Sequence, residues 1–304
     1  MKKGLCFLLI GALLLCFTGC QKNPSNLSAT GEYNGQKIAL QLSSETDIAV
    51  EQLHSFEQGV VIASSGTDFF MISADGKRLT EEEYHFIGGF NEDGYALAQN
   101  PDGEYVYLNT AGAVVESATP STTVKDTERY DSSETTGEKS ETGDYLFGVK
   151  DSDTGEHLTK SIFTWIASTE NELNFATLAS GEHRQVMISP RGEVKAYLPD
   201  NCNMAYLQGD HIICRFEKDI YRLADKTGQL LCDTAFTSIS PFSSGKAVVT
   251  SGAKMGIIGD DGVICIEPQV EIDQPVDNNT PLIWNDTIAC IQNGKLTIVK
   301  AATL

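Results

Sequence analysis

Apolar residues along this chain fall in short runs that end at glycine-containing bends. The clearest stretch runs from Pro241 to Pro268 and begins with an aromatic residue and a turn that ends at Gly245. Two apolar runs follow, and Asp261-Gly262 separates the second of them from a last run, Val263 to Ile266. Asp-Gly between apolar runs is a strong hairpin signal, because both central residues of such a turn need a positive φ angle. The stretch therefore predicts a unit of short antiparallel strands.

The same order of aromatic residue, glycine and β-rich run recurs along the chain. Copies begin at Phe56 and Phe90, and shorter matches lie around 186–192, 221–228 and 288–299. Their turn glycines lie 36, 80, 36, 34 and 32 residues apart, and Gly155 falls near the middle of the step of 80. The pattern predicts seven hairpin turns in repeats of about 35 to 40 residues. The other six glycines are Gly76, Gly112, Gly192, Gly228, Gly262 and Gly294.

Units of this size must lean on one another, since a lone hairpin cannot bury its apolar face. About four strands per repeat suits the blade of a β-propeller. We therefore expect an all-β repeat domain over 32–304, a propeller-like ring of about seven degenerate units, with an open array of hairpins as the alternative. A strand within Glu32 to Leu42 is expected to close the ring against the C-terminal unit, and little helix is expected after the N-terminus.

These repeats resemble the bacterial WG-containing repeat family. The resemblance lies in a Phe-x-x-Gly-x-Ala-x-Val element and a following Gly-x-Ile-x-x-x-Gly element, which fit best from Phe242 to Pro268. Met255 stands where the family has its tryptophan and is expected to be an apolar plug. The resemblance implies an exported or surface β-repeat module and does not imply an enzyme.

One segment, 116–144, interrupts the repeats. It is rich in Ser, Thr, Glu and Asp, and Val124 and Tyr130 are its large apolar residues. Such a segment buries too little apolar surface to offset the entropy lost on ordering. It is predicted to be a disordered insertion, with a binding or modification loop as the alternative.

The N-terminus predicts export and anchoring. A basic start, Met1-Lys2-Lys3, precedes an uncharged apolar stretch from Gly4 to Gly19, which is shorter than the roughly 20 residues of a comfortable membrane span. The stretch ends in Thr18-Gly19-Cys20, which resembles the lipobox of bacterial lipoproteins. That resemblance implies a signal peptide over 1–19, lipidation of Cys20 and a tether over 20–31. An uncleaved anchor helix is the alternative.

The charge balance narrows the choice of partners. The chain has 42 acidic and 22 basic residues, a net charge of −20, and loss of Lys2 and Lys3 would leave 20 − 42 = −22. Such a surface is repelled by nucleic acid and by anionic lipid head groups. We therefore expect no nucleic-acid partner.

Five cysteines follow the tether, an odd number spread singly over strand-like segments: Cys202, Cys214, Cys232, Cys265 and Cys290. No two have the spacing of metal ligands, and the pattern does not resemble a disulfide framework. They are interpreted as small buried side chains, with free and paired states both left open.

No motif indicates catalysis, a cofactor or a metal site. The five histidines have no zinc-site spacing, and no nucleophile elbow occurs. Aspartates such as Asp260 and Asp261 lie at predicted turns, where bonds to the backbone explain them; a calcium site there is the alternative. Seven aromatic residues are expected in the core between units, with a ligand platform as the alternative: Trp165, Trp284, Tyr105, Tyr107, Tyr145, Tyr206 and Tyr221.

These observations together predict a membrane-anchored surface lipoprotein on the extracytoplasmic face of the cell membrane. Its non-catalytic β-repeat domain is expected to bind a protein or an envelope glycan through loops on one face. A propeller-type glycan hydrolase or lyase is the alternative, because 42 acidic residues supply many carboxylate pairs.

Overall fold

The structure is a computed structural model that describes residues 29–115, 133–139, 143–167, 174–179, 184–273 and 276–304. Over these residues all regular structure is β, with antiparallel pairing between neighbouring strands and no helix. Within this part of the chain no helix is long and apolar enough to cross a membrane. The predicted all-β repeat fold is confirmed. Cys20 and the predicted signal peptide, residues 1–19, lie outside the described residues.

The strands form seven units, each a meander of up to four strands in chain order. Unit 7 takes its fourth strand, β2, from the N-terminal end of the domain, and β1 (Thr30–Tyr33) extends the same sheet. The units are unit 1, β3 (Gln52–Glu57), β4 (Val60–Ser65) and β5 (Asp68–Ser73); unit 2, β6 (Phe86–Phe90), β7 (Tyr95–Gln99) and β8 (Tyr105–Asn109); unit 3, β9 (Ser133–Lys139) and β10 (Tyr145–Asp151); unit 4, β11 (Phe163–Ile166), β12 (Asn174–Leu178), β13 (Gln185–Ile188) and β14 (Val194–Tyr197); unit 5, β15 (Met204–Gln208), β16 (His211–Glu217) and β17 (Ile220–Ala224); unit 6, β18 (Ser238–Ile239), β19 (Lys246–Ser251), β20 (Lys254–Gly259) and β21 (Ile264–Glu271); unit 7, β22 (Ile283–Trp284), β23 (Thr287–Gln292), β24 (Lys295–Thr303) and β2 (Gln36–Ala49).

The fourth strand is short in several units. In units 1, 2, 3 and 5 it is reduced to one bridge after the last full strand, as between Ile72 and Arg78 in unit 1 and between Ala224 and Leu230 in unit 5. Units 3 and 4 share one sheet, joined through the pair Phe147 and Phe163. The repeats are therefore degenerate at their outer edges, as the sequence predicted.

The predicted closing strand is present. β2 pairs with β24 over most of its length, from Ile38 opposite Thr303 to Ala49 opposite Lys295. Because its partner is the last strand of the chain, this pairing fastens the N-terminal end of the domain to the C-terminal end.

Successive sheets pack face to face, and each seam is an apolar cluster. Ile62 and Met71 of unit 1 meet Ala98 of unit 2, and Ile213 of unit 5 meets Val249 of unit 6. The centre of the arrangement is the large cluster that joins units 6, 7 and 1, with Met255 buried in it as the predicted plug. Middle strands such as β13 are buried on both faces, which explains their unbroken apolar sequence.

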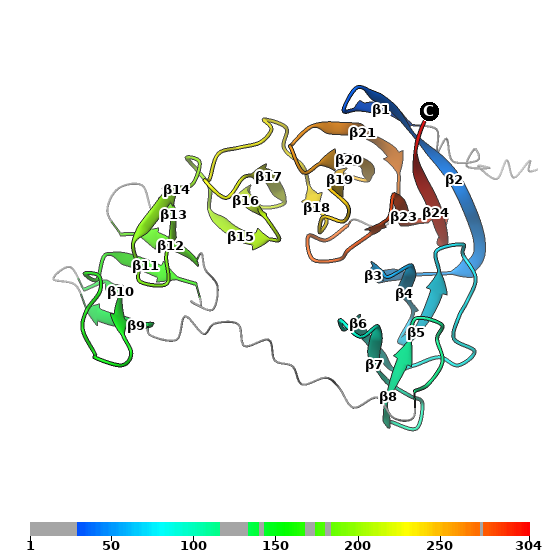
Figure 1. Cartoon of the computed structure of the whole chain (residues 1–304), viewed down its shortest axis with the longest axis horizontal. Coiled ribbons are helices and arrows are strands. Elements are labelled where there is room, and N and C mark those ends of the chain that lie inside the picture. Colours follow the sequence, from blue (N-terminus) through cyan, green and yellow to red (C-terminus); the bar gives the residue numbers. More distant parts are fainter. Residues whose placement is uncertain (1–28, 116–132, 140–142, 168–173, 180–183, 274–275) are drawn as a thin grey trace, which may run out of the picture.

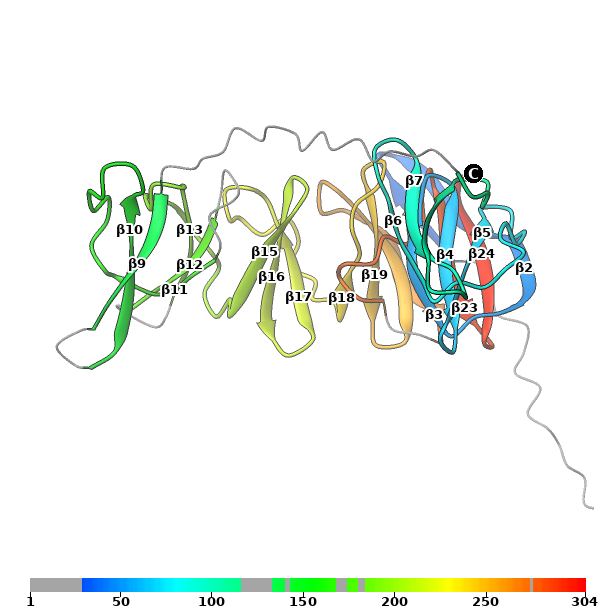
Figure 2. The same cartoon turned by 90° about the horizontal axis from the view of Figure 1, so that it is seen from below.

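The units stand side by side along an arc (Figures 1 and 2). Its order runs from unit 3 through units 4, 5, 6, 7 and 1 to unit 2, so units 2 and 3 are its two ends although they are neighbours in sequence. No apolar cluster of the described residues joins these two units. The architecture is propeller-like, with the strand order of a ring and one seam unformed.

All seven predicted turn glycines adopt a positive φ, from +70° at Gly294 to +83° at Gly76 and Gly228. Five of them follow the third strand of a unit, and Gly155 follows β10, the last full strand of unit 3; in all six the glycine N–H donates to the carbonyl oxygen three or four residues before it, as Gly112 does to Asn109. Gly294 is the exception, since it joins the second and third strands of unit 7. The regular spacing that included Gly294 therefore mixed two kinds of turn.

The prediction of a disordered insertion over 116–144 is wrong for part of its length. Residues 133–139 form β9, which pairs with β10 along its whole length from Ser133 opposite Asp151 to Lys139 opposite Tyr145. β9 is the last strand of its sheet, so backbone hydrogen bonds hold it without any need for apolar side chains. Residues 116–132 and 140–142 lie outside the described residues.

Candidate functional site

Two kinds of loop meet on one face of the arc. Within a four-strand meander, the turn between the second and third strands lies on the same side as the connection to the next unit. The 2–3 turn of unit 5 and the connection from unit 4 to unit 5 illustrate this, since Asn203 in the connection donates to the carbonyl oxygen of Phe216 beside the turn. We call this side the loop face, and both pockets of interest open on it.

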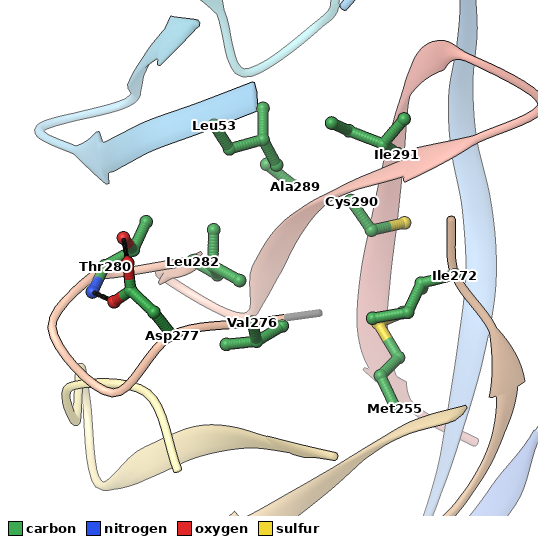
Figure 3. A pocket seen from close by; sticks show the side chains of 10 residues that line it. All are labelled: Leu53, Met255, Ile272, Val276, Asp277, Thr280, Leu282, Ala289, Cys290 and Ile291. Atoms are coloured by element: carbon green, nitrogen blue, oxygen red, sulfur yellow. Dashed lines mark hydrogen bonds between the residues drawn. The ribbon is translucent and has the colours of Figure 1, made fainter. Parts of the chain in front are cut away.

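The first is a narrow pocket between units 6, 7 and 1 (Figure 3). It measures about 390 Å³ with its open mouth included, but only about 30 Å³ of this admits the centre of a water-sized sphere. Its wall is apolar except for Asp277 and Thr280, and Figure 3 shows Leu53 of β3 and Met255 of β20 on opposite sides of it. Such a space takes one or two waters or a slim apolar group.

The rim of this pocket is a strap, residues 276–282, that connects units 6 and 7. Asn278 bonds to units 5 and 6, since its side-chain oxygen accepts from Ile239 N–H at 2.7 Å and its backbone carbonyl oxygen accepts from the Gln208 side-chain amide at 2.8 Å. Pro281 accepts from the Phe56 N–H at 2.7 Å. The strap therefore ties units 1, 5, 6 and 7 together on the inner side of the arc.

Polar groups around the strap are partly desolvated. The Tyr206 hydroxyl and the side-chain amide oxygen (Oε1) of Gln208 are buried without a hydrogen-bond partner. Burial, with lesser repulsion from Tyr221 and Asp277, raises the pKa of Tyr206 far above its ordinary value. Burial lowers the pKa of His54, which bonds Ser64 at 2.9 Å and stacks on Phe69. These groups stay neutral at pH 7, so they act as hydrogen-bonding rather than charged groups.

The second pocket is a wide polar cleft between units 4 and 5. Its empty volume is about 1030 Å³, including open solvent. Its walls come from the connection between the two units and from the end of the β16–β17 hairpin. The lining residues are Asp200, Asn201, Asn203, Phe216, Glu217, Ile220 and Arg222.

Two arginines at this cleft lie over aromatic rings. The Arg222 guanidinium lies over the Phe216 ring at 4.8 Å, and its Nε is buried without a hydrogen-bond partner. Next to the cleft, Arg184 lies over the Tyr197 ring at 4.8 Å and pairs with Asp200 at 3.3 Å. Stacking on a ring fixes a guanidinium plane and leaves its N–H groups for a ligand. In a chain of net charge −20, the cleft therefore concentrates oriented donors beside amides and carboxylates.

The predicted aromatic core is only partly correct. Tyr105, Tyr145 and Trp165 are exposed by 66%, 59% and 42%. Tyr206 and Tyr221 pack against the seam of units 5 and 6, and Trp284 packs against the central cluster. None of the seven lines the polar cleft, and the aromatic residue that does, Phe216, was not singled out because a phenylalanine in a strand gives no signal of its own.

The cysteine interpretation holds for four of five residues. Cys202, Cys214, Cys265 and Cys290 are buried, Cys232 is half-buried, and all five are free. Burial raises the pKa of Cys265 to about 11 and that of Cys290 to about 12. Among the described residues no group of three or more His, Cys, Asp or Glu side chains is placed to hold a metal ion.

Comparison with known proteins does not assign this chain to a family. No protein-family profile matches the chain, and no curated protein does. Among solved structures, the chain aligns with the β-propeller domain of Cps50 (Swd1) from Myceliophteria thermophila at TM-score 0.43 and 9% identity, covering 86% of this chain and 100% of that one. It aligns with BamB from Moraxella catarrhalis at 0.32 and 13%, covering 89% and 95%, and with the computationally designed Ika8 protein at 0.36 and 13%, covering 91% and 97%. Likeness this loose bears on neither fold nor function, and the repeat architecture rests on this chain's own sheet order.

Proposed function

We propose that this chain is an exported lipoprotein whose β-repeat domain binds an envelope glycan in the cleft between units 4 and 5, without cleaving it. The cleft is the observation that supports this best. A glycan presents closely spaced hydroxyl groups, which need both donors and acceptors in fixed positions. Asn201, Asn203 and Arg222 supply donors, and Asp200 and Glu217 supply acceptors, around a space large enough for a sugar unit.

The anchor is part of the proposal. Two or three acyl chains on Cys20 would hold the domain durably at a membrane surface, because each buried methylene contributes about 0.8 kcal/mol. Cys20→Ala should move the protein out of the membrane fraction. If that variant stays in the membrane fraction as the wild type does, the lipobox interpretation is wrong. The WG-family assignment stays a prediction, as does the absence of a nucleic-acid partner.

We propose binding rather than hydrolysis because the sequence carries no catalytic motif. A glycosidase needs two nearby carboxyl groups, one with a raised pKa. Burial raises the pKa of Glu57 at the end of β3, and Glu57 does not line the cleft that holds Asp200 and Glu217. Incubation with cell-wall glycan should release no reducing ends, and sustained release would support the hydrolase alternative.

The test of binding is co-sedimentation of the purified full chain, in mild detergent, with insoluble cell-wall sacculi. Arg222→Met keeps an unbranched side chain over Phe216 and removes the guanidinium. Because hydrogen bonds to charged groups contribute about 1.5–3 kcal/mol, we expect binding to weaken by about tenfold or more.

Arg78 provides a matched control. Its guanidinium lies over the Phe70 ring at 4.7 Å in unit 1, away from the cleft. Arg78→Met should leave sedimentation unchanged. If both variants sediment like the wild type, or if the wild type stays in the supernatant while it binds an envelope protein, the glycan proposal fails.

A further inference from the structure

The two ends of the arc differ from every other unit in how their faces are covered. In unit 2, Ala96 and Ala98 are fully buried against unit 1. Alternation turns their neighbour Leu97 to the opposite face, where it is 37% exposed. In unit 3, Val149 lies against Gly192 of unit 4, so the opposite face of β10 has no neighbouring unit in the described part of the chain. One face of each end unit is therefore not covered by a neighbouring unit.

The uncovered face of unit 2 carries several large apolar and aromatic side chains. Strand register places Leu97 opposite Tyr107, and Gln99 between Phe86 and Tyr105, so these side chains share one face. Phe86 and Tyr105 are exposed by 42% and 66%. A sheet face that meets water normally carries polar side chains. Contiguous exposed apolar residues indicate a surface that another element covers.

The contacts of the turn glycines indicate which part of the chain would cover the exposed face of unit 2. Gly294 joins two strands within unit 7 and is left aside. Of the other six turn glycines, five pack against the preceding unit, where a Cβ would clash: Gly112 against Leu79, Gly262 against Leu231, Gly228 against Tyr197, Gly192 against Thr159, and Gly76 against Thr46 of β2. Gly155 of unit 3 is the exception, because a Cβ there meets nothing within 4 Å. Among these six glycines of the described residues, the contact is missing at Gly155 alone, which lies at the seam between units 2 and 3.

The missing partner of Gly155 is also identifiable. Leu79 and Leu231 each donate their N–H to the third strand of their unit, to Met71 and Leu223. In unit 2 the residue with this bond is Val115, which donates to Tyr107 at 2.8 Å. The repeat therefore places Val115 against the turn of Gly155, as Leu79 lies against Gly112.

We propose that the exposed face of unit 2 receives unit 3 of the same chain, which brings Val115 to the Gly155 turn and closes a seven-unit ring. The chain between the two units, residues 116–132, can reach at most about 60 Å at 3.3–3.6 Å per residue. Such a short link raises the local concentration of unit 3 well above that of a second copy. The proposal does not depend on the glycan-binding role, because the cleft lies at another seam.

The test is cysteine trapping in the full chain. Val115→Cys with Thr154→Cys, one residue before Gly155, should give an intrachain disulfide on oxidation with copper phenanthroline, identified by peptide mass spectrometry. Leu79→Cys with Ala111→Cys is the positive control, because it probes the equivalent seam between units 1 and 2. Val115→Cys with Thr227→Cys, at the same place in unit 5, should not link.

An intrachain link as extensive as the positive control supports closure. Absence of a link where the positive control links, or a link that joins two chains, overturns it. If a double variant does not fold, the melting midpoint of Leu97→Asp tests closure instead. Leu42→Asp is its control, because Leu42 on β2 is 49% exposed. Closure predicts a melting midpoint about 4 °C or more below that of Leu42→Asp, since a charge would be buried at the seam. Equal midpoints overturn the proposal.

Discussion

Gly262 lies where unit 6 leans on unit 5, so one added methyl group there tests the contact between units. Its φ is +81°, and a Cβ would lie 2.6 Å from both the carbonyl oxygen and the Cβ of Leu231. A left-handed backbone costs a non-glycine residue about 1–2 kcal/mol, and overpacking adds about 1–3 kcal/mol. We expect Gly262→Ala to lower the free energy of unfolding by about 3 kcal/mol.

A substitution at Gly252 separates the cost of the left-handed backbone from the cost of overpacking. Its φ is +60°, but a Cβ there meets nothing within 4 Å. Gly252→Ala should therefore cost about 1 kcal/mol, because only the backbone preference remains and the unfolded chain also loses freedom. Urea unfolding followed by far-ultraviolet circular dichroism measures both variants under one set of conditions. Equal losses would refute the idea that each turn glycine is required by the neighbouring unit.

Three further results are expected. Burial holds the pKa of His54 below its ordinary 6.5 in the folded chain, so the contribution of neutral His54 to stability is complete above pH 6.5 and is lost as the pH falls toward the folded pKa. The urea midpoint should therefore drop more between pH 7.5 and 5.5 in the wild type than in His54→Gln. Equal drops in the two proteins would contradict this. Of the five described thiols, Cys232 should be alkylated first under native conditions, because it is only half-buried. Cys290 is buried and its pKa is raised to about 12, so it should react only on unfolding. Peptide mass spectrometry of the alkylated protein measures both. Phe236→Ala should cost about 3–5 kcal/mol, since Phe236 is 1% exposed in the seam of units 5 and 6, and a loss under 1 kcal/mol would argue against that packing.

The repeat architecture was predictable because local chemistry determines it. Glycines that need positive φ and apolar runs of strand length are visible in sequence, and so was the N-terminal strand that became β2. The buried plug at Met255 followed from its place in the repeat. Such features depend on a few neighbouring residues.

The parts that sequence missed depend on contacts between distant segments. β9 was taken for disorder because Ser133–Lys139 is polar, yet an edge strand is held by its backbone bonds to β10. The exposed positions of Tyr105 and Trp165 depend on which faces the neighbouring units cover. The polar cleft brings Asp200 of the connection after unit 4 to Arg222 of β17, and nothing in either local sequence marks that meeting.

The most direct test of the architecture is hydrogen–deuterium exchange of the strand pair that fastens the domain. β2 and β24 bond to each other from opposite ends of the sequence, so their amides should exchange slowly and at similar rates. Residues such as Leu40 and Val299 are buried and should be among the slowest in the chain. Rapid exchange throughout β2 with slow exchange in β23 and β24 would contradict the claim that the N-terminal strand completes the last unit.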